Sequence, residues 1–103
     1  MAPPRLTPEQ RARALEKAAA ARRERAALKQ ALKEGSLTLP DLLARAGTDE
    51  AAGGIKVVAV LTSLPGLGKV KAQRLMEKLG IAESRRLRGL GAKQREALIR
   101  ALS

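Results

Sequence analysis

The chain of 103 residues is long enough for one small domain with an extended arm, and its 21 Lys and Arg against 10 acidic residues give a formal charge of +11. A basic excess of this size indicates a polyanionic partner. The chain has no Cys and no His, which excludes zinc sites, disulfides and thiol, histidine or triad catalysis, and it has no aromatic residue on which unpaired bases could stack. The expected target is therefore duplex backbone, bound without a metal or cofactor.

Neither a signal peptide nor a membrane span is expected. Residues 1–5 lead into a charged stretch without an apolar segment, and no apolar run approaches the length needed to cross a bilayer. The sequence therefore predicts a cytoplasmic protein that is not associated with a membrane.

A long basic helix is predicted over residues 7–34, preceded by a disordered arm of residues 1–6. The start signals are an N-cap residue, a proline at the first helical position and a capping-box glutamine, at Thr7, Pro8 and Gln10. Good helix formers fill the stretch that follows, and Gly35 is the expected stop.

The apolar side chains of this helix do not form one stripe. Leu15 lies on a different face from Leu28 and Leu32, so we expect the first half of the helix to stand away from the core. Residues 1–34 carry nine positive and four negative charges. A solvated, salt-bridged helix and a basic arm that touches nucleic acid account for this charge equally well.

Residues 35–103 are predicted to form a helical DNA-binding core. Its first helix starts at Thr38-Leu39-Pro40-Asp41 and ends before Gly47. The stretch from Thr48 to Gly54 is predicted to be a flexible loop. Because residues 35–55 carry one positive and three negative charges, we interpret them as a spacer and not as a contact surface.

The run from Ile55 to Leu61 is ambiguous. Its β-branched residues between glycines and Thr62-Ser63 could form a short buried strand on propensity alone. We favour a helix here because of the turn that follows it.

That turn, Leu64-Pro65-Gly66-Leu67-Gly68, is the strongest functional signal in the chain. Its glycines permit positive φ and let backbone approach a phosphate, while Leu64 and Leu67 can anchor it in the core. A helix begins directly after it, so unpaired N–H groups and the positive end of the helix dipole point outward. The turn is therefore predicted to bind an anion, with Lys69 and Lys71 adding full charges.

The helix after the turn is amphipathic and is closed by Gly80. One face is apolar and is predicted to pack on the core: Ala72, Leu75, Met76 and Leu79. A second face carries cations at helical spacing: Lys71, Arg74 and Lys78.

A weaker copy of the turn follows at Leu87-Arg88-Gly89-Leu90-Gly91, before a last helix predicted over residues 92–102. The expected buried side of this helix consists of Leu90, Ala97, Leu98, Ala101 and Leu102. Five cations cluster around the turn: Arg85, Arg86, Arg88, Lys93 and Arg95. The segment is either a second phosphate-binding turn, which we favour because residues 56–103 carry eleven positive and three negative charges, or a helix cap with solvated arginines.

The first turn resembles the helix-hairpin-helix motif, and the whole chain resembles the actinobacterial integration host factor family. The resemblance is carried by the Ala-Arg-rich stretch Leu15–Arg25, by Ser63–Val70 and by Met76–Ile81. It implies an all-α fold in which a long N-terminal helix joins a helical core containing a helix-two-turns-helix unit.

The resemblance also implies a function. A family member would be a monomeric nucleoid-associated protein that binds double-stranded DNA through the phosphate backbone and minor groove, largely without sequence specificity. It would bend or compact the DNA, affect supercoiling, support phage site-specific integration, and have phage integrase and topoisomerase as further partners.

The predicted DNA-binding residues come from the resemblance and from the charge pattern. For the first turn and its helix they are Pro65, Gly66, Gly68, Lys69, Val70, Lys71 and Arg74. For the second turn and its flank they are Ser84, Arg85, Arg86, Arg88, Gly89, Gly91 and Lys93.

Two other functions compete with this one, DNA glycosylase activity and rRNA binding. Helix-hairpin-helix DNA glycosylases that use a lysine carry it two positions after the second turn glycine, where this chain has Val70, and glycosylases that use an N-terminal proline would need it where this chain has Ala2. A catalytic role is therefore not expected. The alternative is an rRNA-binding protein similar to ribosomal protein S13, although S13-like chains carry the hairpin nearer the N-terminus and a basic tail after it.

Overall fold

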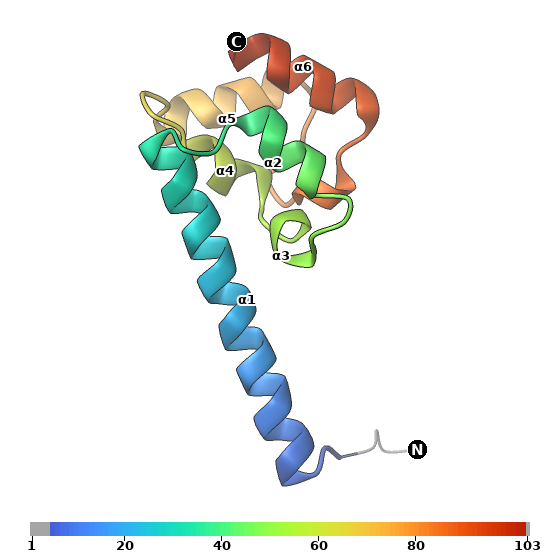
Figure 1. Ribbon diagram of the computed structural model, residues 1–103. Coiled ribbons are helices and arrows are strands. Elements are labelled where there is room, and N and C mark those ends of the chain that lie inside the picture. The colour runs from blue at the N-terminus through green and yellow to red at the C-terminus, as the bar shows by residue number, and fades with distance from the viewer. Residues whose placement is uncertain (1–4, 103) are drawn as a thin grey trace.

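A computed structural model describes residues 5–102, and in that range every regular element is a helix. In chain order the elements are α1 (Pro8–Glu34), α2 (Leu39–Arg45), α3 (Glu50–Gly53), α4 (Val57–Ser63), α5 (Lys69–Lys78), the 3₁₀ turn η1 (Leu87–Gly89) and α6 (Ala92–Leu102). Figure 1 shows α1 as a long rod that leaves a helical body formed by the other elements. The predicted all-α fold with a long N-terminal helix is confirmed. Of the predicted disordered arm, residues 1–4 lie outside the described residues, as does Ser103 of the predicted core.

The local signals at the two ends of α1 act as predicted. The backbone N–H of Gln10 donates to Thr7 Oγ1 at 3.1 Å, and the backbone N–H of Thr7 donates to Gln10 Oε1 at 3.0 Å. This reciprocal capping box satisfies two N–H groups that the helix itself cannot bond. At the other end Gly35 adopts φ 82°, the left-handed conformation that ends many helices.

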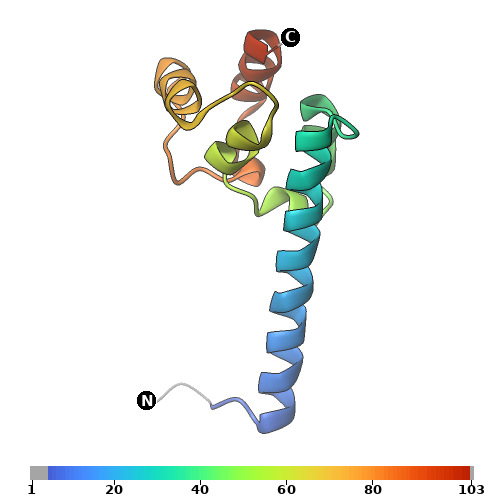
Figure 2. The ribbon, with the colours of Figure 1, turned by 90° about the vertical axis from the view of Figure 1, so that its left-hand side faces the viewer.

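Only the second half of α1 belongs to the core. Leu32 is fully buried, and Leu28 packs against the same cluster. Leu15 is 62% exposed, as its different face predicts. Figure 2 shows the N-terminal half of α1 extending beyond all the other helices. None of the described helices is both long enough and apolar enough to span a bilayer.

The prediction of a flexible loop over Thr48 to Gly54 is wrong. Residues 50–53 form α3, because Asp49 Oδ1 accepts hydrogen bonds from the backbone N–H groups of Ala51 and Ala52 at 2.9 and 3.3 Å. Ala51 to Gly54 are buried, and a Cβ on Gly53 would lie only 2.6 Å from the carbonyl oxygen of Ala46. The small residues therefore allow close packing, and the segment is not merely a spacer.

The ambiguous run after this segment is mostly helical, and the strand alternative is wrong. Helix α4 covers Val57–Ser63, which confirms the helix for most of the run. Ile55 and Lys56 are outside it, and Lys56 forms an isolated antiparallel bridge with Arg86. Two backbone hydrogen bonds surround this bridge, from Val57 N–H to the Arg85 carbonyl at 2.9 Å and from Leu87 N–H to the Ile55 carbonyl at 3.0 Å.

The core lies where α1, α2, α4, α5 and α6 meet. Its fully buried large side chains are Leu32, Leu42, Leu61, Met76, Leu87, Leu98, Val57 and Val60. The predicted apolar face of α5 is confirmed, with Ala72 and Met76 buried. On α6 the prediction for Ala101 is wrong: Ala101 is exposed, and Ile99 packs against the core because an isoleucine removes more apolar surface from water than an alanine can.

Candidate nucleic-acid interface

The first turn joins α4 to α5 and is anchored by its two leucines. The N–H of Leu67 donates to the Leu64 carbonyl at 3.3 Å, which closes the turn, and both side chains pack partly against the core. Gly66 adopts φ 75°, so it needs to be glycine for conformational reasons. Leu64 and Leu67 therefore fix the turn while Pro65, Gly66 and Gly68 remain exposed.

Gly68, unlike Gly66, does not have a positive φ. Its φ of −82° and ψ of 169° are extended backbone that any residue adopts, and an added Cβ would meet no atom of the protein within 4 Å. The prediction that the turn glycines supply positive φ holds for Gly66 alone. At Gly68 the absence of a side chain leaves open space above the backbone.

This open space lies at the N-terminus of α5, which is left uncapped. No side chain accepts a hydrogen bond from its first N–H groups, and its first turn contains no acidic residue. By contrast, α1, α2 and α3 are capped by the side chains of Thr7, Thr38 and Asp49. The start of α5 therefore presents unbonded N–H groups and a positive dipole end to solvent.

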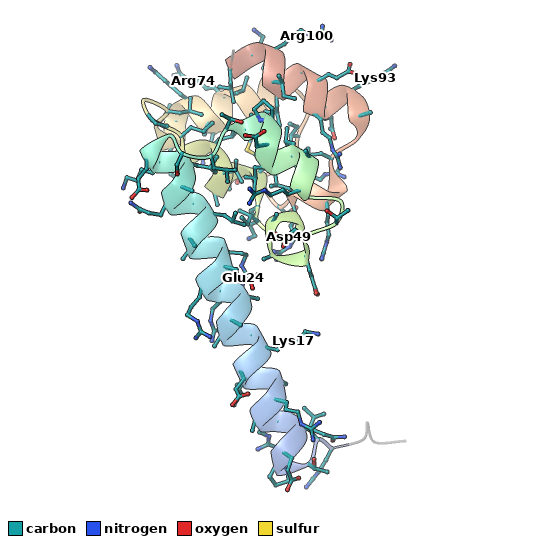
Figure 3. All side chains as sticks on the ribbon, viewed as in Figure 1. Lys17, Glu24, Asp49, Arg74, Lys93 and Arg100 are labelled. Carbon is teal, nitrogen blue, oxygen red and sulfur yellow. The ribbon has the colours of Figure 1, made fainter. Side chains whose placement is uncertain are left out.

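Exposed cations surround this helix start. Lys69, Lys71 and Arg74 are exposed, and Val70 between them is 61% exposed. Figure 3 shows Arg74 pointing away from the body of the protein. The predicted residues of the first turn therefore form one continuous surface with the chemistry of an anion site.

The second turn has similar chemistry on a different side of the molecule. Gly91 precedes α6, has no side chain to act as a cap, and donates its own N–H to Gln94 Oε1 at 3.2 Å. All seven predicted residues here are exposed, namely Ser84, Arg85, Arg86, Arg88, Gly89, Gly91 and Lys93. Figure 3 places Lys93 and Arg74 at opposite ends of the helical body, so the two turns are separate basic regions.

The three arginines beside the second turn are not equivalent. Arg85 Nη1 donates to the Gly89 carbonyl at 2.9 Å, and Arg86 Nη1 donates to the Gly54 carbonyl. Arg88 makes no hydrogen bond or ion pair with any described residue, and its Cβ lies against Gly53. Two of the guanidinium groups are therefore engaged with the protein's own backbone.

Sequence reasoning missed a groove between α1 and the α3–η1 region. Four cations line it, Lys17, Arg25, Arg86 and Arg88, together with Glu24, Glu50 and small residues. Lys17 and Glu24 are labelled in Figure 3 on the side of α1 nearest α3. Alanines spaced along one face of α1 at residues 14, 18 and 21, with Lys17 and Arg25 beside them, were the available signal. Sequence alone does not show which element lies opposite.

The ion pairs expected along a salt-bridged α1 are not observed among the described residues. Within residues 5–102 one ion pair is closer than 4.0 Å. It joins Arg100 Nη2 to Glu96 Oε2 on α6, at 3.6 Å. The described cations of α1, the two turns and the groove are thus unpaired with carboxylates. In the same range of residues there is no cluster of three or more side chains suited to hold a metal ion.

Comparison with known proteins gives consistent results. Residues 32–102 match the family model described as an S13-like H2TH domain. The integration host factor of Mycolicibacterium smegmatis is 61% identical over 99 residues, which cover 96% of this chain and 94% of that protein. The integration host factor of Streptomyces coelicolor is 56% identical over 100 residues, which cover 97% of this chain and 94% of that protein. A solved structure of sIHF bound to an 8-base-pair palindromic DNA superposes with a TM-score of 0.83 at 50% identity, covering 85% of this chain and 99% of that one.

Proposed function

The chain belongs to the integration host factor family of mycobacteria and streptomycetes, and from this membership we propose that it is a nucleoid-associated protein that binds double-stranded DNA. Its residues 32–102 belong to the S13-like H2TH domain family. The sIHF structure with bound DNA supports DNA as the ligand, because that chain is similar over 85% of this one.

The observation that carries the proposal is the exposed turn at the uncapped start of α5. A phosphate placed above Gly68 would accept hydrogen bonds from free N–H groups, without a side chain in the way. Lys69 and Lys71 would add charge from beside it. Since every nucleotide of a duplex presents the same phosphate, this chemistry positions the protein without reading sequence.

We propose that the contacts comprise both turns. At the first turn they are Pro65, Gly66, Gly68, Lys69, Val70, Lys71 and Arg74. At the second turn they are Ser84, Arg85, Arg88, Gly89, Gly91 and Lys93. The groove cations Lys17 and Arg25 extend this surface along α1. Arg86 is not included, because its side chain bonds the backbone at the end of α3, 32 residues away in sequence, whereas the bond of Arg85 to Gly89 stays within the second turn.

Several finer properties form part of the proposal. The protein acts without catalysis, as a cytoplasmic monomer associated with the nucleoid, and contacts phosphates and the minor groove. Because its basic regions lie on different sides, binding would bend or compact DNA and so influence its topology. Support of phage integrase, and cooperation with topoisomerase, would follow from such bending. Imaging of long DNA with added protein, scored for bend angles and compaction, tests this group of properties.

The binding itself is tested by a titration of two duplexes of unrelated sequence across a salt series. Fluorescence anisotropy should give similar affinities for both, and the logarithm of the binding constant should fall linearly with the logarithm of salt, by about 0.9 for each phosphate neutralised. A single sequence bound orders of magnitude more tightly than the other would refute the non-specific mode. Binding that does not depend on salt would refute the phosphate mode.

The S13-like description of the matched domain keeps rRNA as a second candidate ligand. Co-sedimentation with ribosomes, and competition of rRNA fragments against the labelled duplex, distinguish the two. Under the proposed function, duplex DNA displaces the protein from rRNA, and little protein sediments with ribosomes. Stable sedimentation with ribosomes in the presence of excess DNA would favour the rRNA-binding function instead.

A further inference from the structure

The segment between α5 and η1 is held by the buried side chain of Ile81 and, directly before η1, by a backbone connection. Around Arg86, backbone hydrogen bonds connect residues 85–87 with residues 55–57, where α3 is followed by α4. The second turn begins directly after this connection. Its position relative to the groove therefore depends on how firmly the segment is held against α3.

The side chain of Arg86 adds a bond to this connection across 32 residues of sequence. Its Nη1 donates to the carbonyl oxygen of Gly54, the C-cap residue of α3. Carbonyls at a helix end have no partner within the helix and form the negative end of its dipole, so a guanidinium there is favourable in both hydrogen bonding and charge. Helix α3 has only four residues and no basic residue of its own in its last turn, so Arg86 supplies the cation.

The two neighbouring arginines, Arg85 and Arg88, are placed differently from Arg86. Arg85 lies across η1 and donates to the Gly89 carbonyl at 2.9 Å. Arg88 has its Cβ against the buried Gly53, lines the groove, and makes no hydrogen bond or ion pair with a described residue. Arg86 is exposed and lines the same groove, but one of its guanidinium nitrogens is held by α3, whereas no nitrogen of Arg88 is held by the protein.

We infer that Arg86 is a positioning residue, which fixes the second turn against α3 and thereby aims Arg88 at a phosphate, and does not contact a phosphate itself. This inference rests on the proposed function, because it assigns a role within DNA binding. Arginine suits the position because its planar group keeps its hydrogen-bond geometry when one nitrogen is fixed.

Salt series with three single variants test the division of roles. Arg88→Met removes a phosphate contact and should reduce the salt slope by about 0.9. Arg86→Met should leave the slope at the wild-type value and shift the whole line to weaker binding, by about three- to tenfold, because the second turn loses a charge-assisted hydrogen bond that orients it. Arg100→Met is the charge control, since Arg100 lies near the C-terminus, away from the groove, and pairs with Glu96.

Three results would overturn the inference. One is a slope for Arg86→Met that falls as far as that of Arg88→Met, which would make Arg86 a phosphate ligand. Another is a plot of affinity against salt for folded Arg86→Met that coincides with the plot for Arg100→Met, which would make the role of Arg86 structural only. The third is an unchanged slope for Arg88→Met. Failure of the proposed function is separate, because then the wild-type protein itself shows no salt-dependent binding.

A second measurement uses the wild-type protein and so does not depend on the folding of a variant. Side-chain signals of arginine, recorded by NMR with ¹⁵N labelling, report each guanidinium separately. On addition of a short duplex, the Arg88 signal should shift and the Arg86 signal should stay in place. A shift of the Arg86 signal as large as that of Arg88 would overturn the assignment.

Discussion

The two glycines of the first turn are needed for different physical reasons. Gly66 has φ 75°, where a Cβ strains the backbone, so its role is in the fold of the turn. Gly68 has extended backbone and empty space around its missing side chain. Substitution at Gly68 therefore tests ligand approach with little effect on the conformation of the turn.

We predict that Gly68→Val reduces duplex affinity more than Lys69→Ala does. The valine would separate phosphate from about two N–H donors, which corresponds to a loss of tenfold or more at about 1 kcal/mol each. Lys69→Ala removes one screened charge and should weaken binding only a few-fold at about 0.15 M salt. Anisotropy titrations at one salt concentration compare the two variants.

Gly47→Val is the matched control for this prediction. Gly47 is also exposed, has no positive φ, and an added Cβ would meet nothing within 4 Å, but it lies in the loop after α2, outside both turns. Its affinity for DNA should equal that of the wild type. Equal titration curves for Gly68→Val and Lys69→Ala, with both proteins folded, would refute the account of the turn.

At the scale of elements, α1 combines a packed half with a projecting half. Leu32 is in the centre of the core, whereas Leu15 is mostly exposed on the projecting half. The projecting half alone would be a short isolated helix of only marginal stability in water, so the packed half supports it. The groove exists because α1 continues past α3 while it remains anchored at its C-terminal end.

We predict that Leu32→Ala lowers the free energy of unfolding by about 2–5 kcal/mol, because it leaves a cavity at a fully buried position. Chemical denaturation measures this loss. Leu15→Ala is the matched control on the same helix and should change the free energy by no more than about 0.5 kcal/mol. Similar losses for both variants would mean that the N-terminal half of α1 is packed and does not project.

Helices α2, α4, α5 and α6 show how much the sequence predicts at this scale. Their start and stop signals are local, such as Thr38 before α2 and Gly80 after α5, and the predicted bounds agree with the structure to within about two residues. The sequence does not predict the short helix α3, because the glycine pair at its C-terminal end, Gly53 and Gly54, usually marks a loop. Both are buried there, Gly53 against Ala46 and Arg88, and Gly54 near Arg25, and the two arginines are distant in sequence.

At the scale of the whole molecule, the balance of charge differs between elements. Residues 35–55, which include α2 and α3, carry three acids and one cation, whereas cations outnumber acids on α1, α5, η1 and α6. The two turns of the proposed interface were predictable because each is a contiguous motif followed by a helix. The groove was not, since it depends on how α1 packs beside α3 and η1. The bond from Arg86 to Gly54 was not predictable for the same reason.

The most direct test of the central claim is an NMR titration of the ¹⁵N-labelled protein with a short DNA duplex. If the uncapped helix start binds phosphate, the largest amide shifts should fall on Gly66 to Lys71, with a second group on Gly89 to Lys93. The amides of α2 should hardly move, because this helix is acidic at its start and capped by Thr38. Tight binding with the largest shifts in α2 or α3, and none at Gly66 to Lys71, would contradict the claim that this turn holds the DNA backbone.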